Sequence, residues 1–191
     1  MKKQPENILI KEFDYPLSND RIARYPCAER DQSKLLVYDR EKITDAVFAD
    51  IATFFPQSST LVLNDSKVIE ARIFFQKATG GVIEVFCLEP HDIIDPAQAL
   101  MQTKKALWKC LIGGASKWKR GQVLQKRIEI NGHEAALSAK YINKEEDDFV
   151  VQFEWQPAYY SFAEILHMGG TMPLPPYIKR EVQAEDLIRY Q

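Results

Sequence analysis

Four consecutive side chains of different chemical type follow a short apolar run in LVLNDSKVIEAR, residues 61–72. They supply an amide, a carboxylate, a hydroxyl and a cation, from Asn64, Asp65, Ser66 and Lys67, and the segment ends in Arg72. Such a set in one loop can bind a small polar ligand through several hydrogen bonds. In the alternative interpretation the loop is an ordinary turn, in which the Asn and Asp side chains hydrogen-bond their own backbone.

A second candidate segment is MPLPPYIKR, residues 172–180, which is rich in proline and ends in two cations. Proline fixes its own φ and restricts the residue before it, so the segment is predicted to be extended and polyproline-like. A stiff segment holds Tyr177, Lys179 and Arg180 in fixed directions at low entropic cost. These residues are therefore candidates for ligand binding, and the alternative is a structural turn around an apolar tyrosine.

Cations are concentrated between residues 97 and 128, where no Asp or Glu occurs and two tryptophans are interleaved. Cations track phosphates and exposed aromatic rings stack on bases, so the segment is predicted to bind RNA. The predicted contacts are Lys104, Lys105, Lys109, Lys117, Trp118, Lys119 and Arg120; the same segment also holds Lys126, Arg127 and Trp108. The alternative is a solvated strand face with its tryptophans in the core.

Composition is that of an ordinary globular protein: 191 residues, 46% hydrophobic, 27% charged, with a formal net charge of −2. That net charge argues against a protein that binds nucleic acid mainly by its overall charge. The concentration of cations between residues 97 and 128 nevertheless allows a local binding surface. No apolar run approaches the ~20 residues that span a bilayer, and the first residues lack the apolar segment of a signal peptide. We therefore expect a cytoplasmic protein without a membrane partner.

The cysteines and histidines do not suggest a disulfide or a metal site. The three cysteines are an odd number without Cys-x-x-Cys spacing, which indicates reduced thiols in a core or an interface, at Cys27, Cys87 and Cys110. The three histidines are isolated from one another and from carboxylates at ligand spacing, at His91, His133 and His167. We expect no metal.

The elements that must position these side chains change character near Ala71. Before it, the pattern predicts a strand at 34–38, a helix at 47–55 that Pro56 ends, and a buried strand at 60–63. Such apolar runs suit an α/β sheet. The loop at 64–67 would then follow the carboxyl end of a strand, where open α/β sheets place ligands.

After Arg72 the apolar period becomes two, and the turn signals are those of hairpins. Asn131-Gly132 is the strongest of these signals. Six short antiparallel strands are predicted, which usually close as a barrel, at 73–77, 82–88, 107–112, 123–130, 133–141 and 149–155. A helix follows, with Ser161 and Glu164 as a capping box and Gly169-Gly170 as its end.

The predicted fold class is therefore α/β, with an antiparallel β-barrel inserted into an incomplete α/β layered domain. Residues 1–71 and 157–191 would form the discontinuous α/β domain, and residues 72–156 the barrel.

The ordered motifs resemble one family, the S-adenosylmethionine:tRNA ribosyltransferase-isomerases of queuosine biosynthesis. The matching stretches are LVLNDSKVIEAR, MPLPPYIKR, ERDQSKLLV at 29–37, TGGVIEVF at 79–86, GGASKWKRGQVL at 113–124, and the final IRYQ. Family members continue well beyond the Arg-Tyr-Gln step. The resemblance therefore implies that this chain is the front half of such an enzyme, inactive by itself, with a sheet edge that the second half would cover.

The resemblance implies transfer of the ribosyl group of S-adenosylmethionine to 7-aminomethyl-7-deazaguanine in a tRNA anticodon stem-loop, with isomerisation to epoxyqueuosine. Asp65 is the candidate base and Tyr177 the candidate proton donor. The candidate substrate-binding residues are Asn64, Ser66, Lys67, Arg72, Lys179 and Arg180. The sulfonium is already activated, so S-adenosylmethionine acts as the ribosyl donor and no metal or second cofactor is implied.

The chain also departs from the family pattern, which at this loop is usually Asn-Asp-Thr-Arg-Val-Ile-Pro-Ala-Arg. Ser66, Lys67 and Glu70 differ from it, and Lys34 stands where arginine is usual. An Arg-to-Lys change loses the planar two-pronged donor for carboxylate or phosphate. Two alternatives stay open: a noncatalytic RNA-binding paralogue or fragment with the same fold, and a domain whose basic segment is only solvated. The oligomeric state is not determined by the sequence.

Overall fold

The computed structural model describes residues 8–130 and 132–190. The chain divides into two compact units, one of Met1–Asn64 with Pro175–Glu181 and one of Asp65–Leu174 with Val182–Gln191. We call them the hairpin unit and the barrel unit. The barrel unit thus includes residues 65–71 and 157–174, which the sequence pattern assigned to the α/β domain.

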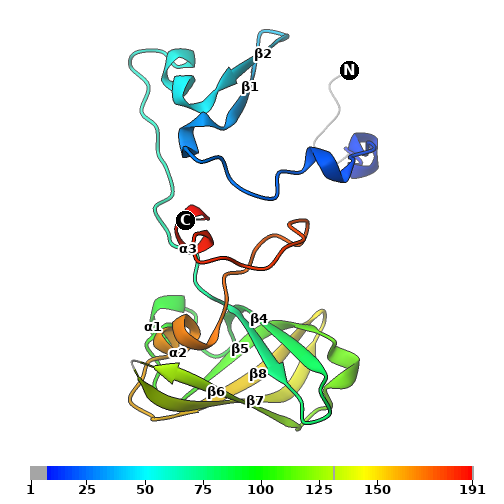
Figure 1. Ribbon diagram of the computed structural model, residues 1–191, viewed down its shortest axis with the longest axis vertical. Coiled ribbons are helices and arrows are strands. Elements are labelled where there is room, and N and C mark those ends of the chain that lie inside the picture. The colour runs from blue at the N-terminus through cyan, green and yellow to red at the C-terminus, as the bar shows by residue number, and fades with distance from the viewer. Residues whose placement is uncertain (1–7, 131, 191) are drawn as a thin grey trace. The chain divides into compact units, whose positions relative to one another are not determined.

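The barrel unit is built on a six-stranded antiparallel sheet in the order β3-β4-β5-β8-β7-β6. Its strands are β3 (Arg72–Gln76), β4 (Val82–Pro90), β5 (Lys105–Gly113), β6 (Val123–Ile130), β7 (His133–Glu145) and β8 (Asp148–Gln156). The edge strands β3 and β6 contact each other, so the sheet is nearly closed and barrel-like (Figure 1). The six predicted strands are confirmed, because their alternating pattern gives each strand one apolar face to bury.

Inward side chains of these strands form the core. In β3, Ile73 and Phe75 are fully buried while Phe74 between them is 40% exposed. Cys87 and Cys110 are free, buried and directly opposite each other on β4 and β5, whereas Cys27 is exposed. Burial raises the pKa of the Cys110 thiol well above its usual value.

Helix α2 (Phe162–Gly169) contributes one side chain to the centre of this core. The ring of Phe162 is fully buried and lies 5.3 to 5.5 Å, centroid to centroid, from the rings of Phe153, Trp108 and Trp155. The predicted capping box is confirmed: Ser161 Oγ accepts from Glu164 N at 3.3 Å, and Glu164 Oε2 accepts from Ser161 N at 2.7 Å. Two shorter helices, α1 (Pro96–Leu100) and α3 (Asp186–Arg189), complete the unit.

The β6–β7 connection has the register of a tight hairpin, because Ile130 pairs with His133. Gly132 has a φ of 78°, which a glycine adopts without steric cost. Asn131, the other residue of the predicted turn, lies outside the described residues.

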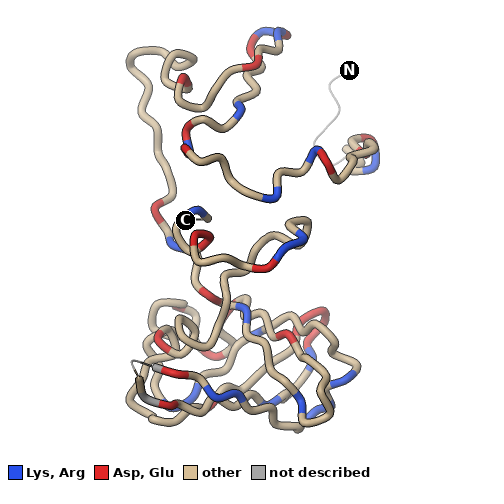
Figure 2. Tube along the Cα trace, viewed as in Figure 1, with Lys and Arg blue, Asp and Glu red and all other residues tan. Residues whose placement is uncertain are grey.

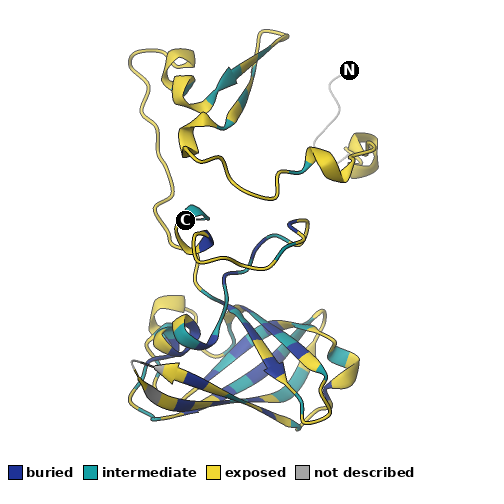
Figure 3. Cartoon of the chain, viewed as in Figure 1, coloured by how far each residue is buried: buried dark blue, intermediate teal, exposed yellow. Residues whose placement is uncertain are grey.

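The hairpin unit contains the antiparallel strands β1 (Lys34–Asp39) and β2 (Lys42–Val47). Its remaining elements are short 3₁₀ helices, η2 (Ile10–Phe13), η3 (Asn19–Arg21), η4 (Arg30–Gln32) and η5 (Phe48–Phe54). The last of these stands where an α-helix was predicted. None of the described residues 8–64 is buried, as Figure 3 shows.

The predicted strand at 60–63 is not present: this segment has no regular structure, with Val62 91% and Leu63 83% exposed. A strand requires a backbone partner, and no strand in the described residues pairs with this run. Within the described residues the layered α/β arrangement is therefore not seen, whereas the antiparallel barrel is. None of the described helices combines the length and apolar character needed to cross a bilayer.

Candidate functional site

The loop that begins with Asn64 joins the two units, since Asn64 is assigned to the hairpin unit and Asp65 to the barrel unit. Asp65, Ser66 and Lys67 are exposed and have no regular secondary structure. Because residues 60–63 form no strand, the loop does not follow the end of a sheet strand as predicted. Its side chains remain accessible to a polar ligand.

The far end of this loop is fixed to the barrel. Arg72 Nε lies 2.9 Å from Glu84 Oε1, and the guanidinium is 5.3 Å from the centroid of the Phe86 ring. Glu70 Oε1 lies 3.0 Å from His167 Nδ1 of α2. Arg72 and Glu70 thus have structural contacts that account for their positions. The role of Arg72 in substrate binding stays a prediction.

Residues 175–180 of the proline-rich segment belong to the hairpin unit and pack there against residues 19–25, whereas residues 172–174 belong to the barrel unit. Arg180 Nε donates to the Arg24 carbonyl oxygen at 2.7 Å, and its guanidinium lies 4.6 Å from the centroid of the Tyr25 ring. Tyr177, which is 58% exposed, and Lys179 line a small cavity together with Arg24. The structure therefore adds Arg24 and Tyr25 to the candidate residues. The sequence signal that could have identified them is that Arg24 and Tyr25 are adjacent and directly precede a proline.

The two candidate catalytic residues belong to different units, Asp65 to the barrel unit and Tyr177 to the hairpin unit. Their roles as base and proton donor stay predictions.

The basic segment does not form one surface, because its cations have different partners. Lys109 Nζ lies 2.9 Å from Glu89 Oε1, and this hydrogen bond raises the pKa of Lys109. Arg120 Nε donates to the Ile142 carbonyl oxygen at 2.7 Å. Lys104 and Lys105 instead line a cavity on the barrel wall.

The expected stacking platform at Trp118 is wrong. Its side chain is 2% exposed, and its indole Nε1 donates to the Gln122 carbonyl oxygen at 2.9 Å. Trp108 is likewise buried, at 3% exposure. Both rings fill the barrel core, because burying an aromatic ring gives more free energy than exposing it and the indole N–H of Trp118 has a backbone acceptor.

Metal-ligating side chains do not gather in the part of the chain that the structure describes. Within residues 8–130 and 132–190, no three His, Cys, Asp or Glu side chains are placed to hold one ion.

Comparison with known proteins decides the family. The sequence model of one protein family, described as queuosine biosynthesis protein, matches residues 10–191, nearly the whole chain. The chain belongs to this family. The match supports the resemblance that the loop at 64–72 and the segment at 172–180 suggest.

Curated relatives in the queuosine biosynthesis family are named S-adenosylmethionine:tRNA ribosyltransferase-isomerase. The protein from Pelobacter propionicus is 36% identical over 186 residues, covering 96% of this chain and 49% of the relative. The one from Trichlorobacter lovleyi is 34% identical over 96% of this chain and 48% of its own length. The one from Fusobacterium nucleatum is 33% identical over 100% of this chain and 49% of its own length.

This member of the queuosine biosynthesis family therefore spans about half the length of the curated relatives it matches. No solved structure is significantly similar to it.

Proposed function

We propose that the chain takes part in transferring the ribosyl group of S-adenosylmethionine to 7-aminomethyl-7-deazaguanine in the anticodon loop of tRNA, and in its isomerisation to epoxyqueuosine. Adenine and methionine are the leaving products. The observation that supports this proposal is the continuous family match over residues 10–191, together with relatives named for that reaction.

In the proposed reaction Asp65 takes a proton next to the sulfonium, and Tyr177 donates one as adenine leaves. Both side chains are exposed, as contact with a substrate requires. Positioned acid and base groups each contribute ~10²–10⁴-fold to the rate. The sulfonium carries the activation of the ribosyl carbon, so S-adenosylmethionine serves as a substrate and the protein supplies proton transfer and orientation.

Orientation is proposed to come from Asn64, Ser66, Lys67 and Arg72 on one segment and from Lys179 and Arg180 on the other. Arg180 is already held by the Arg24 carbonyl and the Tyr25 ring, so its guanidinium is preorganised within the hairpin unit. Preorganised groups lose less entropy when the ligand binds.

The test measures adenine release from S-adenosylmethionine by the protein in the length that its gene encodes, with tRNA carrying 7-aminomethyl-7-deazaguanine. Adenine release should depend on the modified tRNA and should fall by ~10²–10⁴-fold in Asp65→Asn, because the amide cannot act as the base. Asp147→Asn, an exposed carboxylate in the β7–β8 turn, is the matched control and should retain the parental rate.

Two results would count against these assignments. Unchanged turnover in Asp65→Asn would remove Asp65 from the mechanism. A parent protein that binds tRNA but releases no adenine would instead favour the noncatalytic RNA-binding alternative.

A further inference from the structure

An open groove of about 650 Å³ lies on the outer wall of the barrel, on strands β5, β8, β7 and β6. The strand register places Lys105, Glu154, Ser138 and Gln125 in one row across these four strands. A second row contains Gln156, Ala136 and Arg127. These side chains are exposed except that of Ser138, which is half-buried and donates its hydroxyl to the Glu154 carbonyl oxygen at 3.2 Å. Ala106, Phe153 and Leu124 beside them in the strands are buried, so both rows face outward.

Side-chain size explains the hollow. The middle of the groove is floored by Ala136 and Ser138, two of the smallest side chains, on β7. Long side chains stand at its margins, Lys105 on β5 and Arg127 on β6. The result is a channel with a polar floor and cationic margins.

Backbone geometry adds a further cation at the β5 margin. Strand alternation would send Lys104 to the opposite side from Lys105, but Lys104 has a φ of 70°. This left-handed conformation breaks the alternation, and both lysines line the groove. A non-glycine residue in this conformation is strained, and the surrounding structure must offset the strain.

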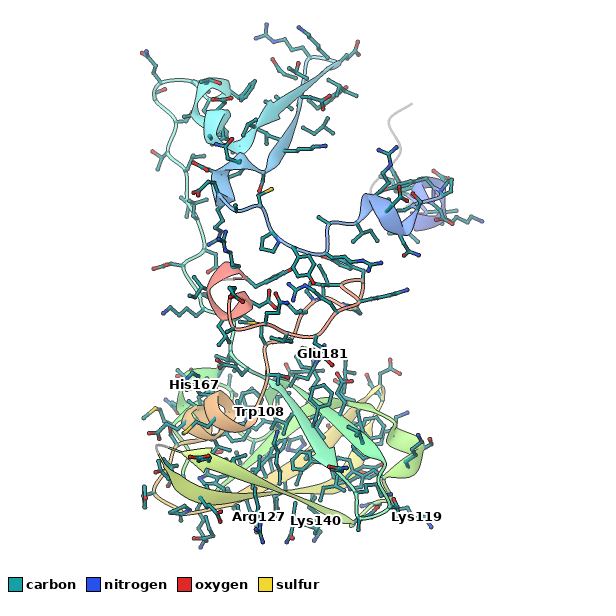
Figure 4. The ribbon with its side chains drawn as sticks, in the orientation of Figure 1. Trp108, Lys119, Arg127, Lys140, His167 and Glu181 are labelled. Carbon is teal, nitrogen blue, oxygen red and sulfur yellow. The ribbon has the colours of Figure 1, made fainter. Side chains whose placement is uncertain are left out.

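The positive strip continues beyond the groove. Lys140 on β7 pairs with Gln152 and Val123 one outward row away, and Figure 4 shows Arg127 and Lys140 on the same side of the barrel. Arg120, whose Nε reaches the Ile142 carbonyl oxygen, lies just past the same strand segment. Lys and Arg therefore mark this wall of the barrel in Figure 2.

Acidic groups define where the strip ends. Of the described residues that line the groove, Glu154 is the one acid, and its Oε1 accepts from Gln152 Nε2 at 2.7 Å. Glu129 and Glu134 pair with each other in the next outward row, toward the β6–β7 turn. Electrostatic attraction therefore favours a polyanion that lies along the wall from Arg127 toward Lys140 and Arg120, and the two glutamates repel one that extends toward the β6–β7 turn.

Lys126, although it lines the groove, has a structural role. It is half-buried on the inward side, and its Nζ donates to the Gly169 carbonyl oxygen at the end of α2 at 2.6 Å. Burial lowers the pKa of Lys126. It is therefore not counted among the contacts to a ligand.

We propose that this groove, with the adjoining Lys140, binds the sugar-phosphate backbone of RNA, with Lys105, Arg127 and Lys140 on phosphates and the Ser138 hydroxyl and Gln side chains on ribose hydroxyls. The one aromatic side chain among the described lining residues, Trp155, is 2% exposed, so base stacking is not available and the contact is independent of sequence. A lipid surface would need several exposed apolar side chains beside the cations, and the two rows that line the groove carry only Ala136 as an outward apolar side chain. The identification of the RNA as tRNA rests on the proposed function.

The test is the salt dependence of binding to an unmodified anticodon stem-loop RNA. For single-stranded contacts, log affinity falls with log salt by ~0.7 per phosphate contact, so removing three contacts should flatten the slope by about 2 units. The variant combines Lys105→Ala, Arg127→Ala and Lys140→Ala, all at exposed side chains, and a thermal melt checks that it is folded. A second variant, which combines Lys105→Arg, Arg127→Lys and Lys140→Arg, should have the parental slope because it keeps the three positive charges.

A charge-matched control separates the groove from the effect of net charge. Lys11→Ala, Lys42→Ala and Lys144→Ala remove three exposed cations outside the groove and should leave the slope within about 0.7 of a unit of the parent. A groove variant with the parental slope, or a control that loses as much as the groove variant, overturns the proposal.

Failure of this proposal and failure of the proposed function give different results. A groove variant that binds as the parent does, while the parent releases adenine, counts against the groove alone. Groove-dependent binding in a protein that releases no adenine counts against the proposed reaction alone.

Discussion

At the scale of single residues, His91 shows how the fold changes the chemistry of an isolated side chain. It follows β4 directly, and its Nδ1 lies 2.5 Å from Asp92 Oδ1 while its Nε2 lies 3.2 Å from Glu145 Oε1. These hydrogen bonds, that to Asp92 first, raise the pKa of His91, and burial opposes them only in part. Glu145 is far away in sequence, so this pairing was not visible in the sequence.

We predict that the imidazole of His91 titrates above the ordinary value of about 6.5. A group whose pKa is raised in the folded state contributes stability that is fully present below the unfolded pKa and is lost as pH rises through the folded pKa. The free energy of unfolding should therefore decline between about pH 6.5 and the higher folded pKa. His91→Gln should remove this decline, as urea unfolding across that pH range would measure.

An NMR titration provides the direct check, with the His91 resonance assigned by its absence in His91→Gln. A midpoint at or below about 6.5 would contradict the contacts with Asp92 and Glu145.

At the scale of elements, α2 combines ends that its sequence specifies with packing that the sequence does not show. Its start is fixed by the capping box of Ser161 and Glu164, and its end by Gly169 and Gly170. Gly170 is required because a Cβ there would lie 1.9 Å from the Glu70 carbonyl oxygen. Helix α2 is thereby held against the segment that leads into β3.

We predict that Gly170→Ala destabilises the protein more than Ser161→Ala. Loss of the cap costs about 1 kcal/mol, whereas the added methyl group meets the backbone at both Glu70 and Leu166, which cannot move aside cheaply. Urea unfolding of both variants measures the difference. Gly81→Ala is the matched control, since a Cβ there meets nothing within 4 Å and its φ is not positive. A Gly170→Ala variant no less stable than Gly81→Ala would show that the close approach does not exist.

At the scale of the whole molecule, the buried core belongs to the barrel unit. Every residue of the main hydrophobic cluster falls between Ala71 and Leu166. The described part of the hairpin unit before residue 65 has no buried residue, and its sheet has only two strands. A two-stranded hairpin is marginally stable by itself.

We predict that amide hydrogens of the central strands β4, β5 and β8 exchange on the order of 100-fold more slowly than those of β1 and β2 in the 191-residue chain. Slow exchange requires opening of the packed core, whereas the hairpin opens locally at a low free-energy cost. Hydrogen exchange followed by mass spectrometry measures both sets at once. Equal protection of β1 and β5 would mean that the hairpin unit has a core which the exposures do not show.

The sequence alone determined the features that depend on neighbours along the chain. The alternating pattern predicted six strands, and Ser161 with Glu164 and Gly169 with Gly170 predicted the two ends of α2. Ordered motifs over the chain predicted the family. Each of these signals is local, so the residues that encode it lie within one element or one turn.

Only the tertiary structure decided which way side chains face and what they contact. Trp118 follows a 3₁₀ turn outside the strands, where alternation gives no direction, and it is buried. The run at 60–63 has a strand's composition but no partner in the described residues. Lys105, Arg127 and Lys140 come from three strands and share one wall because register brings them together, whereas Lys109, four residues after Lys105, pairs with Glu89. Strand register and side-chain partners are long-range properties. They distribute the residues of one basic segment among a groove, an ion pair and the buried core.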